Sequence, residues 1–398
     1  METAEITPGD GVLGDNCGLT RQGTPIAYLV IVRKGPTWAP ADLEPLCRLL
    51  SRRFAGEIWA FGSYDADIRV ERFRLRVVSE ERSSIRLVNV LRSARQMLRW
   101  AAELRRAPVS RLTVISVDPF KGGLLAQYVA KRAKGIFVCE INGVYADRNN
   151  LGGSNIFWMR SLRLAIRRSL GAFVLSRAAA VRLLFADQMK GFVRLPTRVL
   201  IRQFFDIAHI ERFYVGVEEP IILAVGFPFL VKGFDILCRA FHSIASEHPG
   251  WKLVLIGYGA PEQLRAAGLE HPQIEAHPGV LQPRLAEWMS RCAIFALPSR
   301  TEAMGRVLIE AGAAAKCRVA SRVDGIPTVI EDGVDGLLVE KEDVGQLAAT
   351  LARLINDSAL RRRLGEAARA RIQREFSGEV YVEHYAELVS SALKRRGA

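Results

Sequence analysis

The segment that decides the fold is Ala293–Ala311, which reads AIFALPSRTEAMGRVLIEA. Its first residues are continuously apolar, as expected of a β-strand that is buried on both faces of a sheet. Pro298 and Ser299 then predict a turn, and the apolar spacing beyond them predicts a helix that begins near Arg306. A buried strand that passes through a short loop into a helix is the repeating unit of a parallel α/β sheet.

The same alternation of strand and helix extends along the chain in both directions. The expected strands are Ile26–Val32, Glu57–Phe61, Leu112–Val117, Ile136–Ile141, Val181–Phe185, Arg198–Ile201, Ile221–Val225, Lys252–Ile256, Ala293–Leu297, Cys317–Ala320 and Gly336–Val339. The expected helices are Ala41–Phe54, Ile85–Arg106, Lys121–Lys134, Ile156–Leu175, Gly233–Ser246, Pro283–Arg291, Arg306–Ala314, Val344–Ile355, Leu360–Glu375 and Glu379–Lys394. This pattern predicts two doubly wound parallel sheets, each covered by helices on both sides.

A Gly, Glu and Pro stretch near residues 215–220 interrupts the pattern and predicts a linker between two domains. We therefore expect a flexible N-terminal tail at residues 1–24, one α/β domain at 25–215 and a second at 216–377. The last helix, residues 378–398, is expected to pack back on the first domain. The two domains are expected to face each other across a cleft.

Composition limits the classes of protein that fit this chain. Its 398 residues are 49% hydrophobic and 25% charged, close to ordinary globular usage, which excludes a wholly disordered chain. The six cysteines form no C-x-x-C pair, which excludes the common zinc motifs and favours a reducing compartment. The first 25 residues are polar, unlike a secretory signal, and no apolar run approaches membrane-spanning length. We expect a cytoplasmic protein.

The formal net charge of +14 is confined to the first half of the chain. Residues 1–218 hold 34 Lys and Arg against 20 Asp and Glu, whereas the remaining residues are neutral overall. A basic half predicts a polyanionic partner, such as an anionic membrane or a phosphorylated substrate. No RNA- or DNA-binding motif accompanies the charge, so we expect no nucleic acid partner.

Two glutamates in the fold-deciding segment are candidates for chemistry. Glu302 lies before the expected helix and Glu310 about one turn inside it, while Gly305 stands where the helix begins. Free N–H groups at a helix N-terminus favour an anion such as a phosphate, and a carboxylate can accept two hydroxyl hydrogen bonds. The arrangement suits a sugar linked to a nucleoside diphosphate. On spacing alone, however, a loop glutamate and a solvated helix glutamate remain the plainer interpretation.

Several ordered blocks, taken together, resemble the donor domain of the family 4 retaining glycosyltransferases, which have the GT-B fold. The resemblance covers nearly all of Ile221–Ser390. The matching blocks are AVGFPFLVKGFDILCRAF (Ala224–Phe241), VLIGYGAPEQL (Val254–Leu264), HPGV (His277–Val280), AIFALPSRTEAMGRVLIEAGAA (Ala293–Ala314) and SRVDGIPTVIEDGVDGLLV (Ser321–Val339).

The resemblance implies a role for each matching residue. It places Glu302 against the donor hexose, Glu310 on the ribose hydroxyls and Lys232 on the diphosphate. Backbone groups of Met304, Gly305, Arg306 and Val307 would also bind the diphosphate, and Gly226, Phe227 and Gly257 would lie in turns beside the donor. It further implies transfer with retention of anomeric configuration. Because a lysine and a helix N-terminus would stabilise the departing diphosphate, we expect neither a metal nor a cofactor.

The chain also departs from the family pattern. Phe227 follows Gly226 where relatives commonly carry arginine, and Glu302-Ala303-Met304-Gly305 replaces the usual Glu-Gly-Phe-Gly. Asn142 stands where many relatives carry a histidine near the reacting sugar. An asparagine can hydrogen-bond a sugar hydroxyl but cannot carry a proton between substrates, and an Asn-Gly turn explains it equally well. These departures leave open a degenerate, non-catalytic protein that binds a membrane or polyanion.

Three further patterns belong to the first half. Asp118 ends an expected strand, and we favour a helix cap for it over a role in the cleft. Asp65 and Asp67 form an Asp-x-Asp sequence, which elsewhere binds metal, but a solvated loop is the better interpretation here. The expected helix Ile156–Leu175 carries four arginines together with aromatic residues, as a membrane-surface helix would; the alternative is a sheet-covering helix with a solvated arginine face. These arginines are Arg160, Arg163, Arg167 and Arg168.

This charge pattern and the resemblance predict the partners. We expect a nucleotide-sugar donor and a lipid-linked or otherwise anionic glycan acceptor. The setting would be the synthesis of a cell-surface polysaccharide or glycolipid, with the protein bound peripherally at the inner face of the cell membrane.

Overall fold

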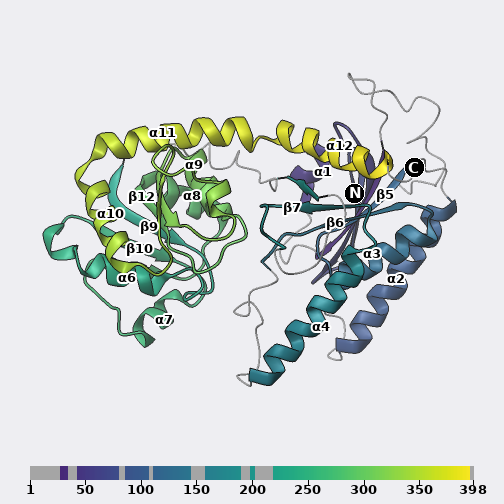
Figure 1. Cartoon of the computed structure of the whole chain (residues 1–398), viewed down its shortest axis with the longest axis horizontal. Helices are drawn as coiled ribbons and strands as arrows, with labels where there is room; N and C mark the ends of the chain where they lie inside the picture. The colour runs from purple at the N-terminus through teal and green to yellow at the C-terminus, as the bar shows by residue number, and fades with distance from the viewer. Residues whose placement is uncertain are drawn as a thin grey trace, which may run out of the picture. The chain divides into compact units, whose positions relative to one another are not determined.

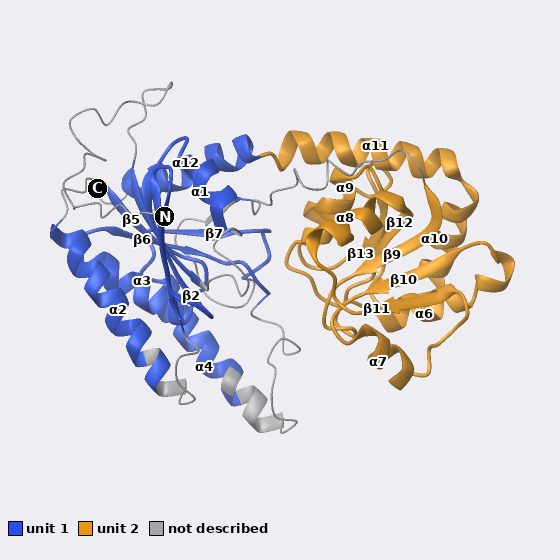
Figure 2. Ribbon diagram, turned by 180° about the vertical axis from the view of Figure 1, so that it is seen from behind, with its two compact units in different colours: residues 1–203, 378–398 blue, residues 204–377 orange. Residues whose placement is uncertain are grey.

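The computed structural model describes residues 27–34, 43–79, 86–106, 111–144, 157–189, 198–201 and 218–394. The chain divides into two compact units (Figure 2). The first comprises Met1–Gln203 together with Gly378–Ala398, and the second comprises Phe204–Ser377. The tail that the sequence predicts, residues 1–24, lies outside the described residues.

The first unit is built on a sheet of order β3-β4-β2-β1-β5-β6-β7-β8. Strand β3 pairs antiparallel with β4, and the other neighbours pair in parallel. The strands are β1 (Tyr28–Lys34), β2 (Ala55–Gly62), β3 (Ala66–Val70), β4 (Phe73–Ser79), β5 (Leu112–Ser116), β6 (Ile136–Glu140), β7 (Ala180–Leu183) and β8 (Arg198–Leu200).

Strands β3 and β4 were not predicted, because charged residues interrupt their apolar pattern. Arg74 and Arg76 both lie in β4. Arg74 binds Asp67 of β3 at 2.6 Å, and the buried Arg76 binds Glu103 at 2.7 Å. The charges are therefore satisfied by partners that the local sequence does not reveal.

Helices cover both faces of the first sheet, as predicted. On one face, α2 (Arg86–Arg106), α3 (Lys121–Arg132) and α4 (Phe157–Leu175) join the strands in a single apolar core. In this core the rings of Trp59 and Trp100 lie 5.5 Å apart. Helices α1 (Glu44–Leu50) and α12 (Gly378–Lys394) contact each other, and α12 packs on β6 and β7 (Figure 1).

A buried hydrogen-bond network fastens the C-terminal helix α12 to the first unit. The Tyr385 hydroxyl donates to one oxygen of Glu140 at 2.7 Å, and Arg182 donates to the other at 2.8 Å. All three side chains are buried. Burial, together with the charge of Glu140, raises the pKa of Tyr385, so its hydroxyl keeps the donated proton at neutral pH.

The second unit is built on a parallel sheet of order β11-β10-β9-β12-β13-β14. The strands are β9 (Glu219–Val225), β10 (Lys252–Ile256), β11 (Ile274–His277), β12 (Cys292–Leu297), β13 (Cys317–Ser321) and β14 (Leu337–Val339). The strand order reverses between β9 and β12. In an open α/β sheet, ligands bind outside the carboxyl ends of the strands at such a switch point.

The helices of the second unit lie on both faces of its sheet. Helices α6 (Phe234–His242), α7 (Ala260–Ala266), α10 (Val344–Asn356) and α11 (Ser358–Glu375) share one apolar core with the strands. Helices α8 (Gln282–Arg291) and α9 (Arg306–Ala313) contact β12. Helix α7 and strand β11 were not predicted, because both are short and polar residues interrupt their apolar pattern. The helix expected over Gly233–Ser246 ends at His242, and a 3₁₀ turn follows it at Ala245–Glu247.

Two expectations from the sequence concern the cysteines and membrane-spanning segments, and both can be compared with the described residues. The five cysteines among them are buried and form no disulfide. No helix in these ranges has both the length and the apolar character that crossing a bilayer requires.

Candidate functional site

The predicted donor residues of the second unit gather at the switch point of its sheet. Gly226 and Phe227 follow β9, Gly257 follows β10, and Pro298 begins the loop after β12. The backbone N–H of Gly226 donates to the carbonyl of Ile256 at 2.9 Å, which holds the loop after β9 against β10. The loops at this edge are thus ordered by backbone contacts with neighbouring strands.

Lys232 and Glu302 meet here although they are 70 residues apart in sequence. The Lys232 ammonium forms an ion pair with Oε2 of Glu302, and the two side chains are only 17% and 13% exposed. Gly233 permits the approach: its φ is 69°, and a Cβ at this position would lie 1.9 Å from the Pro298 carbonyl oxygen. A larger residue at position 233 would push the two loops apart.

Arg300 clamps the same two loops together, and the sequence analysis did not identify it. Its backbone N–H donates to the Val231 carbonyl at 2.8 Å, and its guanidinium binds both oxygens of Asp235 at 2.7 and 2.9 Å. Burial alone would raise the pKa of Asp235, but the hydrogen bonds and charge of Arg300 lower it. The clamp fixes the spacing at which Lys232 reaches Glu302.

Asp324 holds the loop that carries Glu302. One oxygen of Asp324 accepts from the Thr301 hydroxyl at 2.6 Å and from the Glu302 backbone N–H at 3.0 Å. The Gly325 N–H in turn donates to the Glu302 carbonyl at 3.2 Å. Glu302 therefore has a fixed backbone as well as a paired side chain.

Helix α9 begins beside this pair and supplies a site for an anion. Gly305 precedes it with φ 78°, and Met304 is buried under the turn. In general, the backbone N–H groups at a helix N-terminus lie outside the helix's own hydrogen-bond ladder and point along its axis. Together with the helix dipole, they favour negative charge at this end.

Glu310 lies inside α9 with almost no exposed surface. Nε of Arg306 donates to its Oε1 at 2.8 Å, while nearly half of the Arg306 side chain remains exposed. The sequence analysis considered only the backbone of Arg306. Its side chain places a second cation at the start of α9, on the carboxylate expected to bind ribose.

Two exposed aromatic rings lie at the carboxyl ends of β9 and β10. Phe227 and Tyr258 pack edge to face, with ring centroids 5.6 Å apart and an interplanar angle of 88°. At position 227, where the resemblance implies an arginine, this chain therefore presents an aromatic surface.

Asn142 belongs to the first unit, where it follows β6. Its Oδ1 accepts a hydrogen bond from Arg182 at 2.9 Å, and Arg182 also binds Glu140. Gln188 donates to the carbonyls of Ile141 and Gly143 on either side of it. Its Nδ2 group donates to the Val117 carbonyl at 3.5 Å. Both ends of the side chain thus have structural partners, and the second hydrogen of Nδ2 is the part that can serve a substrate hydroxyl.

The acidic motifs of the first unit are engaged in its fold. Asp118 accepts from the N–H groups of Phe120 and Gly122 at the start of α3, so the predicted helix cap is present; burial raises the pKa of Asp118. Asp65 and Asp67 were expected in a solvated loop, but Asp67 lies in β3 and binds Arg74, and Asp65 accepts from the Ser79 N–H at 2.7 Å. Within the described ranges, no group of three or more acidic, His or Cys side chains could hold a metal ion.

The arginines predicted to contact a membrane lie on α4. Arg168 is exposed, whereas Arg167 is partly buried with its guanidinium carbon 5.7 Å from the centre of the Phe120 ring. The side chains of Arg160 and Arg163 lie outside the described residues.

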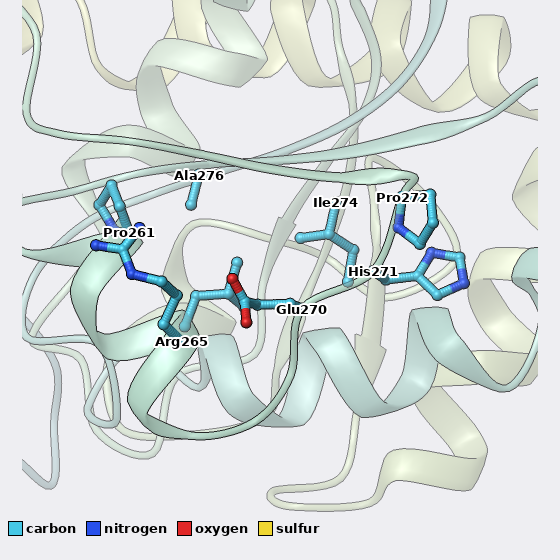
Figure 3. Close-up of a pocket in the computed structure, with 8 residues that line it drawn as sticks. Pro261, Arg265, Glu270, His271, Pro272, Ile274 and Ala276 are labelled. Carbon is cyan, nitrogen blue, oxygen red and sulfur yellow. The ribbon is translucent and has the colours of Figure 1, made fainter.

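The second unit also has a pocket of about 430 Å³ beside α7 and β11. Figure 3 shows its lining, which includes Arg265, Glu270 and His271. The predicted donor residues do not line it, and β11 is the sheet's edge strand, away from the switch point. It is therefore separate from the candidate donor site.

Residues 209–371 match the family model described as "Glycosyl transferases group 1". The matched segment covers most of the second unit and contains Lys232, Glu302 and Glu310. A D-inositol 3-phosphate glycosyltransferase of Xylanimonas cellulosilytica is 34% identical over 196 residues, which are 47% of this chain and 46% of that protein. An exopolysaccharide phosphotransferase of Streptomyces coelicolor is 37% identical over 172 residues, 42% of this chain and 18% of that protein.

The chain therefore spans less than half the length of these curated relatives. Solved structures resemble it over both units. Sucrose-phosphate synthase from Thermosynechococcus elongatus has a TM-score of 0.71 at 17% identity, covering 93% of this chain and 100% of that one. Anabaena HepE, solved in complex with UDP and glucose, has a TM-score of 0.68 at 17% identity, covering 92% and 100%. The two units have the GT-B fold.

Proposed function

We propose that this protein transfers a sugar from a nucleotide-sugar to an acceptor. The observation that carries the proposal is the Lys232–Glu302 ion pair, which lies at the switch point beside the N-terminus of α9. A cation, a carboxylate and a helix N-terminus in one place suit a sugar diphosphate. Solved GT-B structures that contain UDP with glucose, or UDP-glucose, support a donor of this class.

The donor would occupy this site in a defined orientation. The diphosphate would lie at the first turn of α9 with Lys232 beside it, the hexose would contact Glu302, and the ribose hydroxyls would bind Glu310. Glu310 must first release Arg306, with which it pairs in the structure. Because Arg306 stands at the helix start, its guanidinium can then reach the diphosphate and supply the cation that Phe227 does not.

The reaction we propose retains the anomeric configuration. The acceptor oxygen attacks the anomeric carbon from the face that the diphosphate leaves. The bond between that carbon and the diphosphate oxygen breaks, and the oxygen keeps the electron pair and takes the acceptor proton. Lys232 and the helix N-terminus stabilise the charge that develops on the leaving group, so no metal is needed.

The acceptor would bind the basic first unit. Its positive charge favours a lipid-linked or otherwise anionic glycan at the cytoplasmic face of the membrane. A relative named as an exopolysaccharide phosphotransferase supports a place in the synthesis of a cell-surface polysaccharide or glycolipid. Asn142, through its Nδ2 group, would hydrogen-bond a sugar hydroxyl.

The proposal is tested by incubating the protein with a panel of UDP- and GDP-sugars and measuring release of the nucleoside diphosphate. Slow hydrolysis of one donor, abolished in Glu302→Gln but not in Glu275→Gln, would support it. Glu275 is the matched control because it forms an exposed pair with Lys252 in the same unit.

The alternative is a non-catalytic protein of the same fold, favoured by the aromatic surface at Phe227 in place of an arginine. It predicts that no donor is hydrolysed and that none protects the protein against thermal unfolding.

A further inference from the structure

The exposed apolar side chains of the first unit are concentrated on three neighbouring helices. Among its described residues, every large apolar side chain that is exposed belongs to α2, α3 or α4. Helix α3 contacts both α2 and α4, and all three lie on one face of the sheet. The side chains are Val88, Leu91, Leu98, Leu124, Tyr128, Leu162, Ile166 and Phe173. We call this surface the three-helix face.

On α4 these side chains form a stripe along the outer side of the helix. Leu162, Ile166 and Phe173 recur at helical spacing and are about half exposed, whereas Leu164 and Val174 point into the core and are buried. A helix that only covered a sheet would carry polar residues on its outer side. On the outer side of α4 the apolar side chains lie together with the exposed Ser169, the exposed Arg168 borders them, and the partly buried Arg167 lies toward the sheet.

The charged residues in the sequences of these three helices are almost all basic. Helices α2, α3 and α4 carry 13 Lys and Arg and a single acidic residue, Glu103. Glu103 is already paired with Arg76. Exposed on α2 alone are Arg95, Arg99, Arg105 and Arg106.

We propose that the three-helix face docks on an anionic lipid bilayer. Apolar side chains on the outer side of helices, bordered by arginines and nearly free of acids, suit insertion at the boundary between lipid headgroups and acyl chains. The arginines can extend their charged ends to lipid phosphates while their stems cover apolar surface. A basic and apolar surface of this kind matches a bilayer better than a protein, because most protein surfaces offer both signs of charge.

Docking through this face extends the proposed function. It rests on that proposal in one respect only, which is that the acceptor is lipid-linked. It would hold the acceptor-binding unit at the membrane, where a lipid-linked acceptor is anchored. The docking itself requires no donor and no turnover, so it can be tested separately.

The test is flotation of the full chain with vesicles, either of phosphatidylcholine alone or of phosphatidylcholine mixed with phosphatidylglycerol. One variant combines Leu162→Ser, Ile166→Ser and Phe173→Ser; its matched control combines Leu281→Ser and Val334→Ser, exposed apolar residues of the second unit. A charge variant changes four α2 arginines to glutamine, Arg95, Arg99, Arg105 and Arg106. Its control changes four exposed arginines of the second unit to glutamine, Arg239, Arg284, Arg353 and Arg362.

We expect the wild type to bind anionic vesicles at least about tenfold more tightly than neutral ones, and to be released as salt rises. Each face variant should lose at least about tenfold in anionic-vesicle affinity, while both controls bind as wild type. Equal binding to both vesicles, or face variants that bind as well as their controls, would overturn the proposal. A wild type that binds neither kind of vesicle would also overturn the proposal. This holds even if the protein forms dimers through this face. Nucleotide binding measured on the same proteins separates this failure from failure of the proposed function.

Discussion

The Lys232 ammonium is paired with the Glu302 carboxylate, although the two residues come from loops that follow different strands. The loop after β9 supplies the lysine, and the loop after β12 supplies the glutamate. The Arg300–Asp235 clamp and the contacts of Asp324 hold these loops in register. A cation that is fixed before substrate arrives needs little reorganisation when charge develops on a leaving group. The pair is therefore the structural basis of the proposed transfer.

Replacing Lys232 with methionine should lower turnover far more than it lowers donor affinity. The ammonium is expected to act mainly on charge that develops in the transition state, and losing such a group costs about 10²–10³-fold in kcat. The measurement is nucleoside diphosphate release at varied donor concentration. Lys252→Met is the control, because Lys252 also pairs with a glutamate but on the surface. Equal kcat values in the two variants would contradict the assignment.

Arg306 should distinguish a nucleoside diphosphate from a nucleoside. If its guanidinium moves from Glu310 to the diphosphate, Arg306→Ala removes a charge-assisted contact and weakens diphosphate binding by about tenfold or more. The nucleoside, which has no phosphate, should bind the variant at least as well as wild type because Glu310 is already free. Calorimetric titration with both ligands gives the ratio of their dissociation constants. The control is Arg265→Ala, because Arg265 is an exposed arginine of α7. An unchanged ratio would show that Arg306 stays on Glu310.

Asn142→Asp separates a structural role from a role in binding substrate. The aspartate can still accept the hydrogen bond from Arg182 and loses only the long, 3.5 Å hydrogen bond to the Val117 carbonyl, so the melting temperature should fall only slightly. It has no amide hydrogens to donate, so turnover with the physiological acceptor should fall by about tenfold if Nδ2 binds a sugar hydroxyl. Full activity in the variant would restrict Asn142 to the network around Arg182.

The Arg300–Asp235 clamp should contribute a stability that depends on pH. Arg300 lowers the pKa of Asp235 in the folded state, so the clamp stabilises the protein above the unfolded value of about 3.9 and this contribution is lost as pH falls through the lower, folded pKa. Asp235→Asn should therefore lower stability by about 1–3 kcal/mol at pH 7. The difference from wild type should shrink below about pH 4.

Chemical denaturation at several pH values measures this effect. The control is Glu219→Gln, because Glu219 forms a similar two-bond pair with Arg291 that is far more exposed and should matter less. If the loss of unfolding free energy in Asp235→Asn does not vary with pH, packing and not charge explains the loss.

Activity should survive treatment with EDTA. In our account Lys232 and the N-terminus of α9 provide the positive charge that a metal provides elsewhere. The measurement is donor turnover before and after chelation and dialysis. Complete loss of activity that manganese or magnesium restores would refute metal independence.

Most of the fold could be predicted from apolar periodicity, because strands such as β10 and β12 are buried on both faces and flanked by clear turns. Strands β3 and β4 could not, since their arginines are satisfied by Asp67 and Glu103, which only tertiary contacts bring near. The Glu302 and Glu310 motif was visible in sequence, but the Arg300–Asp235 clamp was not, because its partners are 65 residues apart and of common surface types. Which side of α4 faces outward could not be predicted either, because both its apolar residues and its arginines recur at helical spacing. Only the burial of the side chains shows it.

The most direct test of the donor site is calorimetric titration of wild type, Glu310→Gln and Glu302→Gln with nucleoside diphosphates and their sugars. Our account predicts that wild type binds one nucleotide series and that Glu310→Gln weakens both the diphosphate and the sugar form by about 10–100-fold, since the ribose loses a charged acceptor. Glu302→Gln should leave the diphosphate almost unaffected and chiefly lower turnover. Binding that is absent in wild type, or equal in all three proteins, would contradict the account.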